Sequence, residues 1–262
     1  MKNIIYTCIF LIFLTSCKTL KVTGEFLDNP PNVVPKIALS TDLNRNNWQH
    51  LDPINDSVPG MSVDKAYKEL IKDSEGKTVV VAVLDTGIDI KHEDLKGNIW
   101  VNKKEIPGNN MDDDKNGFID DVYGWNFLGD AYYEQLELTR LLAKGEDFPE
   151  KEDAQKDYDK RRAEARGEET LKYYLNYDFK GRTTGDDPDN FEEIYYGDNK
   201  VEHSREDESH GTHVAGIIAA ARNNNLGMKG VANNVEIMTL RVVPYGDEYD
   251  KDIALGLSLI HI

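Results

Sequence analysis

The stretch VVVAVLDTG, residues 79–87, decides how the chain is interpreted. Its six apolar residues are mostly β-branched, which suits a strand covered on both faces, as in a parallel sheet. The turn Asp85-Thr86-Gly87 follows directly, at what would be the carboxyl end of that strand. In open α/β sheets, the residues that bind ligands and carry out catalysis usually lie at this end of the strands. The sequence therefore predicts a parallel sheet with Asp85 at its active edge.

A second stretch, HGTHVAGIIAAARNN at residues 210–224, predicts a helix. Val214, Ile217, Ile218 and Ala221 form one apolar stripe at helical spacing, and the small residues among them allow close packing. The run VEIMTLRVV, residues 235–243, predicts a second strand. A strand, a long crossover, a helix and a strand form a βαβ arrangement, so we expect an α/β fold whose mainly parallel sheet carries helices on both faces.

Two unrelated protease mechanisms use an aspartate in the setting of Asp85. An aspartic protease pairs it with a second equivalent Asp, from another domain or another subunit. The chain contains no second hydrophobic Asp-Thr-Gly, although dimerisation could supply one. A serine protease instead uses the Asp to orient a His that activates a Ser. The HGTHVAG helix has no use in an aspartic protease, so it favours the second mechanism.

Four motifs together resemble the subtilisin-like serine peptidase family. They are VAVLDTGID, His-x-Asp-Leu at residues 92–95, SHGTHVAGIIAA at residues 209–220 and GVANNVEIMTLRVV. The resemblance covers residues 79 to about 254, apart from a large insertion. It implies a subtilisin-like fold, serine-type endopeptidase activity and a polypeptide substrate. It also assigns Asp85 as the aspartate of the catalytic triad and His210 as the general base.

The chemistry of acyl transfer explains these residue types. A serine hydroxyl is a weak nucleophile, so a neutral imidazole must take its proton during attack. A buried carboxylate then holds the tautomer and stabilises the imidazolium. The two residues lie 210 − 85 = 125 positions apart, because a charged insertion at about residues 130–208 separates them. The sequence pattern of the insertion predicts two helices, at residues 133–145 and 153–177, the second with a break at Gly167. We interpret the insertion as a largely helical, solvated surface element that serves as a lid or a docking element.

The nucleophile is not among the motifs. The family pattern Gly-Thr-Ser-Met-Ala and the asparagine of the oxyanion hole are absent from the 262 residues. The last six residues, LSLIHI at 257–262, match the translation of a transposon adapter used in sequencing libraries. We therefore expect residues 61–256 to be the amino-terminal part of a peptidase domain whose sheet is incomplete, and this chain alone to be inactive. A non-catalytic subtilisin-fold binding protein of the cell envelope is the alternative. An envelope calcium-binding module does not explain HGTHVAG.

His210 and His213 stand three residues apart and could imitate a metal-binding pair. The sequence lacks the His-Glu-x-x-His pattern of zinc proteases. We therefore expect His213 to be a packed helix residue.

The loop DDDKNGFID at residues 112–120 resembles the start of an EF-hand calcium loop. The expected ligands are Asp112, Asp114, Asn116, the Phe118 carbonyl and Asp120. The twelfth position is Tyr123 rather than Glu, and Asp121 could substitute. Related acidic loops in the family strengthen the prediction of a structural Ca²⁺, with a solvated acidic turn as the alternative. We expect no organic cofactor.

The amino terminus has the features of an export signal. A basic start and a short apolar run are followed by Leu-Thr-Ser before Cys17. This order resembles the bacterial lipoprotein box, which implies a signal peptide at residues 1–16, lipid on Cys17 and a membrane-anchored protein of the cell envelope, at the outer membrane or cell surface. Residues 17–60 predict a tether or short leader, with an apolar patch at 47–52 that docks on the domain. The net charge of −17 gives no reason to expect a nucleic-acid partner.

Overall fold

The computed structural model describes residues 42–261 apart from 73–75, 183, 204 and 206–207. The expected signal peptide, Cys17 and the first part of the expected tether lie outside the described residues. Within the described part of the chain, no helix is long and apolar enough to cross a membrane.

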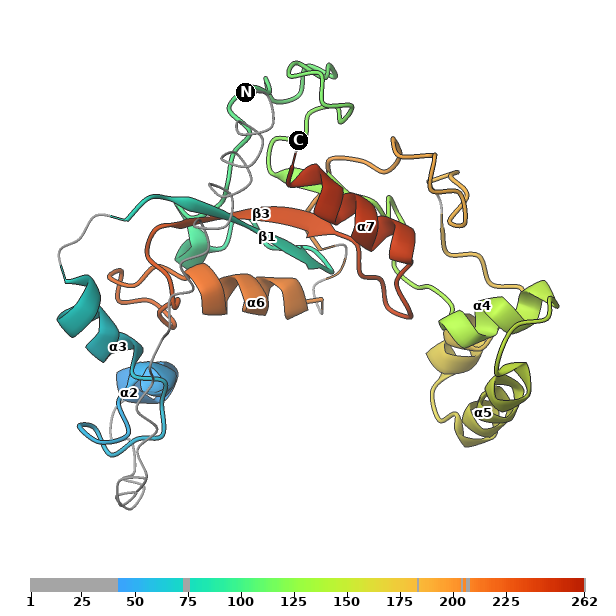
Figure 1. Cartoon of the computed structure of the whole chain (residues 1–262), viewed down its shortest axis with the longest axis horizontal. Helices are drawn as coiled ribbons and strands as arrows, with labels where there is room; N and C mark the ends of the chain where they lie inside the picture. Colours follow the sequence, from blue (N-terminus) through green and yellow to red (C-terminus); the bar gives the residue numbers. More distant parts are fainter. Residues whose placement is uncertain (1–41, 73–75, 183, 204, 206–207, 262) are drawn as a thin grey trace, which may run out of the picture.

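A three-stranded parallel sheet forms the centre of the molecule (Figure 1). Its strands are β1 (Val79–Asp85), β2 (Gly124–Asn126) and β3 (Val235–Arg241), in the order β1-β3-β2. The register pairs Asp85 with Arg241 and Asn126 with the same arginine, so all three strands end at one edge. The prediction of a mainly parallel sheet is confirmed.

The helical segments follow one another along the described chain. They are α2 (Asp42–Asn47), η2 (Trp48–His50), α3 (Val63–Ala66), the π-helical η3 (Tyr67–Ile71), η4 (Glu93–Leu95), α4 (Glu137–Lys144), α5 (Lys151–Glu164), the π-helical η5 (Thr170–Tyr174), α6 (His210–Ala219) and α7 (Asp250–Leu259). The helix expected at residues 210–224 therefore ends five residues early.

Two hydrophobic clusters cover the two faces of the sheet. Alternate residues of a strand point to opposite faces, so Val83 packs with Ala215 of α6, whereas Leu84 packs with Leu259 of α7. Figure 1 shows α6 on one side of the strands and α7 on the other. The predicted cover of helices on both faces is confirmed.

The segment before the sheet is docked from Asp42 onward. His50 is fully buried, and its Nε2 donates to the carbonyl of Lys229 at 2.8 Å. The side chain of Asn47 accepts from the backbone N–H of Lys229, also at 2.8 Å. The patch at residues 47–52 therefore docks as expected, but residues 42–60 are not a free tether.

Ser62 precedes α3 but does not cap it through its side chain. Its hydroxyl donates to Asp52 at 2.9 Å instead. Leu70 of η3 is 80% exposed, and neither α3 nor η3 contains a buried residue, so this helical segment packs only loosely on the domain.

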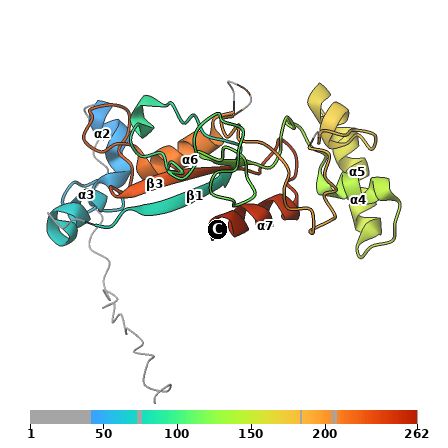
Figure 2. The same cartoon turned by 90° about the horizontal axis from the view of Figure 1, so that it is seen from above.

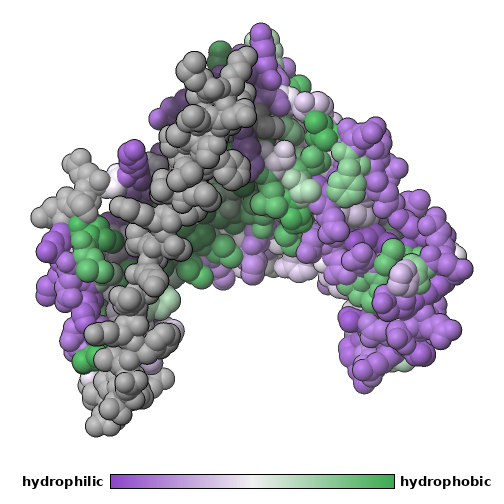
Figure 3. All heavy atoms as spheres, in the orientation of Figure 1, coloured by the Kyte–Doolittle hydropathy of each residue, from purple (hydrophilic) through white to green (hydrophobic). Residues whose placement is uncertain are grey.

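The insertion forms a helical unit beside the sheet (Figure 2). α4 and α5 pack around Leu142, Tyr158 and Leu175, a small core of their own. The predicted helices are confirmed, and α5 ends before Gly167 as expected. Figure 3 shows mainly hydrophilic residues over this unit, whereas hydrophobic residues gather nearer the sheet.

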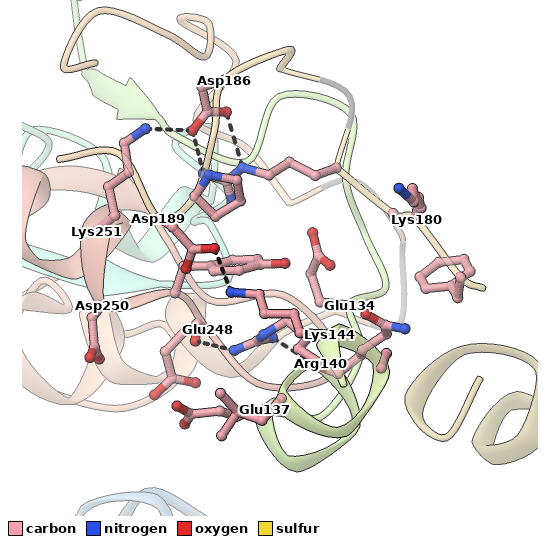
Figure 4. Close-up of a pocket in the computed structure, with 18 of the residues that line it drawn as sticks. Glu134, Glu137, Arg140, Lys144, Lys180, Asp186, Asp189, Glu248, Asp250 and Lys251 are labelled. Atoms are coloured by element: carbon pink, nitrogen blue, oxygen red, sulfur yellow. Dashed lines mark hydrogen bonds and ion pairs between the residues drawn. The ribbon is translucent and has the colours of Figure 1, made fainter. Parts of the chain in front are cut away.

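A buried ion network joins the insertion to α7 (Figure 4). Arg182 donates to Asp252 at 2.7 Å and to Asp186 at 3.0 Å, and Lys251 donates to Asp186 at 2.8 Å. Burial alone would raise the pKa of Asp186, but the hydrogen bonds from Arg182 and Lys251 outweigh it and hold this pKa at about 2. Arg182, Asp186 and Lys251 also line a cavity of about 610 Å³ between the insertion and α7.

Replacing Asp252 by Asn tests whether this network fixes the insertion. The carboxylate is fully buried and is paired with Arg182, so its loss leaves an arginine with one partner fewer. We expect the free energy of unfolding to fall by about 3–5 kcal/mol and Tm by roughly 6–20 °C. Asp157→Asn breaks an exposed pair with Arg161 on α5 and should cost under about 1 kcal/mol. Equal losses in thermal unfolding of the two variants would contradict the prediction.

Candidate active site and acidic loop

Asp85 ends β1 and faces the start of α6. The residue is only 7% exposed. Its carboxylate accepts the backbone N–H of Thr86 at 2.8 Å. Its backbone carbonyl accepts from Val242 and Val243, so the main chain around the carboxylate is fixed. The main chain and the Thr86 N–H thus fix the orientation of the carboxylate at the end of β1.

His210 is the first residue of α6 and supplies the partner of Asp85. Its Nδ1 lies 2.9 Å from both carboxylate oxygens of Asp85. The side chain of His210 is 75% exposed, in contrast to the carboxylate beside it. When Nδ1 donates to the carboxylate, Nε2 carries the free lone pair and can act as a base. The structure thus brings together the two residues that the sequence predicted as an aspartate–histidine pair.

Glycines allow α6 to approach the end of β1 this closely. A Cβ on Gly211 would lie 2.2 Å from the carbonyl oxygen of Gly87, a distance that no side chain tolerates. Gly87 itself has φ +118°, a backbone conformation that favours glycine. The hydroxyl of Thr212 then accepts the backbone N–H of Asp89 at 3.0 Å and ties the two segments together. These contacts explain why small residues flank the histidine.

His213, one turn further along α6, is exposed. The expectation that it packs is wrong, because the helix turns this position away from the sheet. The described residues hold one group of three or more potential metal ligands, and His213 is not in it.

That group is Glu105, Asp114 and Asp121, whose carboxylate oxygens lie within 4.8 Å of one another. Burial raises the pKa of Asp121 to about 6, and the charges of Asp114 and Glu105 add to this effect. Lys104 is 3.9 Å from Asp114 but its side chain is 73% exposed, so solvent screens its charge. Three clustered oxygens of this kind suit a hard divalent cation.

The expected ligand set differs from this group. Asp112 accepts the backbone N–H groups of Asn116 and Gly117, and Asp120 accepts those of Gly108 and Asn110. These two carboxylates bind backbone N–H groups of the loop, as Glu105 also does with those of Asp113 and Asp120. Asp114 lies in the group together with Asp121, the residue expected as a substitute ligand.

The other two expected positions also serve the loop. Asn116 donates to Asp121 at 2.9 Å, and the ring of Phe118 packs on Trp125. Glu105 was not predicted as a ligand, because it precedes the loop and the EF-hand motif includes no ligand at that distance before its first position.

Gly211 is the sharpest test of the site geometry. Gly211→Ala places a methyl group against the Gly87 carbonyl, so the first turn of α6 must move away from Asp85. We expect a loss of about 1–3 kcal/mol in the free energy of unfolding. Gly216→Ala, in the same helix, meets no atom within 4 Å and should stabilise by about 0.5–1 kcal/mol. Denaturant unfolding measures both, and a Gly211→Ala variant as stable as the original chain would refute the close packing.

Comparisons with known proteins identify the family of the chain. The model of the subtilase family matches residues 76–260, more than half of the chain. Subtilisin-like protease 1 of Plasmodium falciparum (isolate 3D7) is 27% identical over 177 residues, which cover 67% of this chain and 16% of that protein.

Two further relatives match over shorter stretches. Subtilisin-like protease 1 of Plasmodium berghei (strain Anka) is 46% identical over 65 residues, 24% of this chain and 11% of the relative. The major intracellular serine protease of Bacillus subtilis (strain 168) is 40% identical over 83 residues, 32% of this chain and 24% of the relative. The matched part of the chain thus spans a quarter or less of each of these three proteins. With the family model covering the sheet, the Asp85 turn and α6, the chain belongs to the subtilase family.

Proposed function

We propose that the protein is a serine-type endopeptidase in which Asp85 and His210 are two members of a Ser-His-Asp triad. The observation that carries the proposal is the contact of 2.9 Å between His210 Nδ1 and the buried carboxylate. This contact orients an exposed imidazole so that Nε2 can take a proton from a hydroxyl. A polypeptide is the substrate class that the family and the names of its relatives support.

The reaction would proceed through an acyl-enzyme. His210 Nε2 takes the serine proton as the oxygen attacks the peptide carbonyl, and it later gives that proton to the leaving amine. Asp85 stabilises the imidazolium that forms between these steps. The 262 residues contain no Gly-Thr-Ser-Met-Ala motif. The proposal therefore requires a nucleophilic serine outside these residues.

Labelling of the full-length gene product with a fluorophosphonate tests the activity. The probe reacts only with a serine that a base activates. His210→Ala should slow labelling at least about 10³-fold. His213→Ala is the matched control, because this exposed histidine lies in the same helix and should leave the rate unchanged. If the unmodified protein is not labelled, the alternative of a non-catalytic envelope binding protein with a subtilisin fold replaces the proposal.

We also propose a structural Ca²⁺ at Glu105, Asp114 and Asp121. A cation there would remove the repulsion among three carboxylates that share a partly buried site. It would fix the acidic loop, whose Phe118 packs into the core of the sheet. The ion has no step in the peptidase reaction and serves the fold alone.

Thermal unfolding with and without calcium tests this site. At a calcium concentration about 100 times Kd, binding stabilises the fold by about 2.7 kcal/mol, which corresponds to roughly 5–11 °C in Tm. Asp121→Asn should remove this dependence. Asp153→Asn, a change at an exposed carboxylate of α5, should retain it. The same Tm in excess calcium and in EGTA would exclude the site.

We further propose that the protein is exported and held at the cell envelope by lipid on Cys17. The support is the basic start, the short apolar run and the Leu-Thr-Ser that precede this cysteine. Cys17→Ser should therefore abolish incorporation of a labelled fatty acid and move the protein from the membrane to the soluble fraction. Cys8→Ser, within the expected signal peptide, should change neither. Label retained in Cys17→Ser would disprove the anchor.

A further inference from the structure

Arg241 is buried at the point where Asp85, the first turn of the insertion and the approach to α6 meet. It is the last residue of β3 and the register partner of Asp85. Only 1% of its surface is exposed. A guanidinium in such a place is tolerated only when its N–H groups find acceptors.

One of these acceptors belongs to the turn that holds the catalytic carboxylate. Nε of Arg241 donates to the carbonyl of Thr86 at 2.9 Å. The N–H of the same Thr86 donates to Asp85 Oδ1 at 2.8 Å. Thr86 is thus held at its carbonyl by the arginine while its N–H holds the carboxylate. A change at position 241 therefore reaches Asp85 through a single residue.

The other nitrogens of Arg241 bind the chain that leaves β2. Nη1 donates to the Gly129 carbonyl at 3.1 Å and to Asn126 Oδ1 at 3.3 Å, and Nη2 donates to the Ala131 carbonyl at 3.1 Å. These acceptors set the plane of the guanidinium. A lysine at this position has the charge but not the planar fork, so it cannot reproduce the set.

The charge of Arg241 also interacts with the segment that leads into α6. Burial lowers the pKa of Arg241, and the carboxylate of Glu208 opposes this shift. Glu208 is 1% exposed and precedes His210 by two residues. Asp198 and Asp130 oppose the shift in the same way, so Glu208 is one of several carboxylates whose charge stabilises the buried guanidinium.

We propose that Arg241 is a positioning residue that holds the Thr86 turn, and through it the Asp85 carboxylate, in the orientation that keeps the proton of His210 on Nδ1. The kinetic consequence of this role rests on the proposed peptidase function. The structural consequence does not, because the tautomer of His210 can be measured in the chain itself.

The tautomer is the decisive measurement. A free neutral imidazole favours the proton on Nε2, whereas a carboxylate that faces Nδ1 draws it to Nδ1. Two-bond proton–nitrogen correlations of isotope-labelled histidine distinguish the two forms, with the imidazole neutral. We expect the Nδ1–H form to dominate in the unmodified chain and the Nε2–H form to increase at least about twofold in Arg241→Lys.

Arg222→Lys is the matched control. Arg222 also has a buried side chain that donates to a backbone carbonyl, that of Gly230, and pairs with Asp64. It lies beyond the far end of α6, so its replacement should destabilise the fold without changing the tautomer of His210. A shift in both variants would show a general loss of structure and overturn the proposal, as would no shift in Arg241→Lys.

Glu208→Gln provides a second variant of nearly unchanged shape if Arg241→Lys does not fold. It removes a buried carboxylate whose charge stabilises the guanidinium, and it should also increase the Nε2–H form. In the full-length protein, Arg241→Lys should slow fluorophosphonate labelling about 10–100-fold, whereas Arg222→Lys should not. An unlabelled parent protein would refute the peptidase function while leaving the tautomer result valid. An unchanged tautomer in Glu208→Gln and in any folded Arg241→Lys protein would refute the positioning role.

Discussion

The parallel pairing of β1 with β3 is the constraint on which the other features depend. It brings the ends of both strands to one edge and makes Asp85 and Arg241 neighbours. The carboxylate then stands where α6 can reach it, and the guanidinium stands where it can bind the turn that follows. A shift of β1 by one residue against β3 would turn the side chain of Asp85 to the other face of the sheet, away from α6 and from that of Arg241. The pair of Asp85 and His210 therefore depends on the whole ladder rather than on the two residues.

Close backbone contacts are the second requirement. A Cβ on Gly211 would overlap the Gly87 carbonyl, and one on Gly124 would lie 1.9 Å from the carbonyl of Thr239. Glycine at these positions lets α6 and β2 approach the central strands at main-chain distance. Because these segments lie so close together, side chains on neighbouring segments can contact one another directly.

The insertion shows how a long segment fits between two parts of one site. The entropic cost of closing a loop grows only slowly with its length, so a separation of 125 positions between Asp85 and His210 is compatible with a close contact. The unit around Leu142 has its own small core, and the buried pairs of Arg182 fix it to α7. This arrangement pairs the buried carboxylate of Asp186 with Arg182 and Lys251, which offsets the cost of removing these charges from water.

The sequence by itself determined two of the three parallel strands, β1 and β3, the helix that begins at His210 and the position of Asp85 at the end of a strand, whereas the three-residue β2 was not predicted. Each of these features depends on residues that are close together in the sequence, so local periodicity and the two motifs are enough to predict it. The helical insertion with its break near Gly167 was predictable for the same reason.

Only the tertiary structure decided which charged groups meet. Glu105 joins Asp114 and Asp121, whereas Asp120 turns to backbone N–H groups of its own loop. The environment of Arg241 likewise depends on segments more than 100 residues away in the sequence. The physical reason is that periodicity defines the face on which a side chain lies, but the partner on that face comes from distant parts of the chain that only folding brings together.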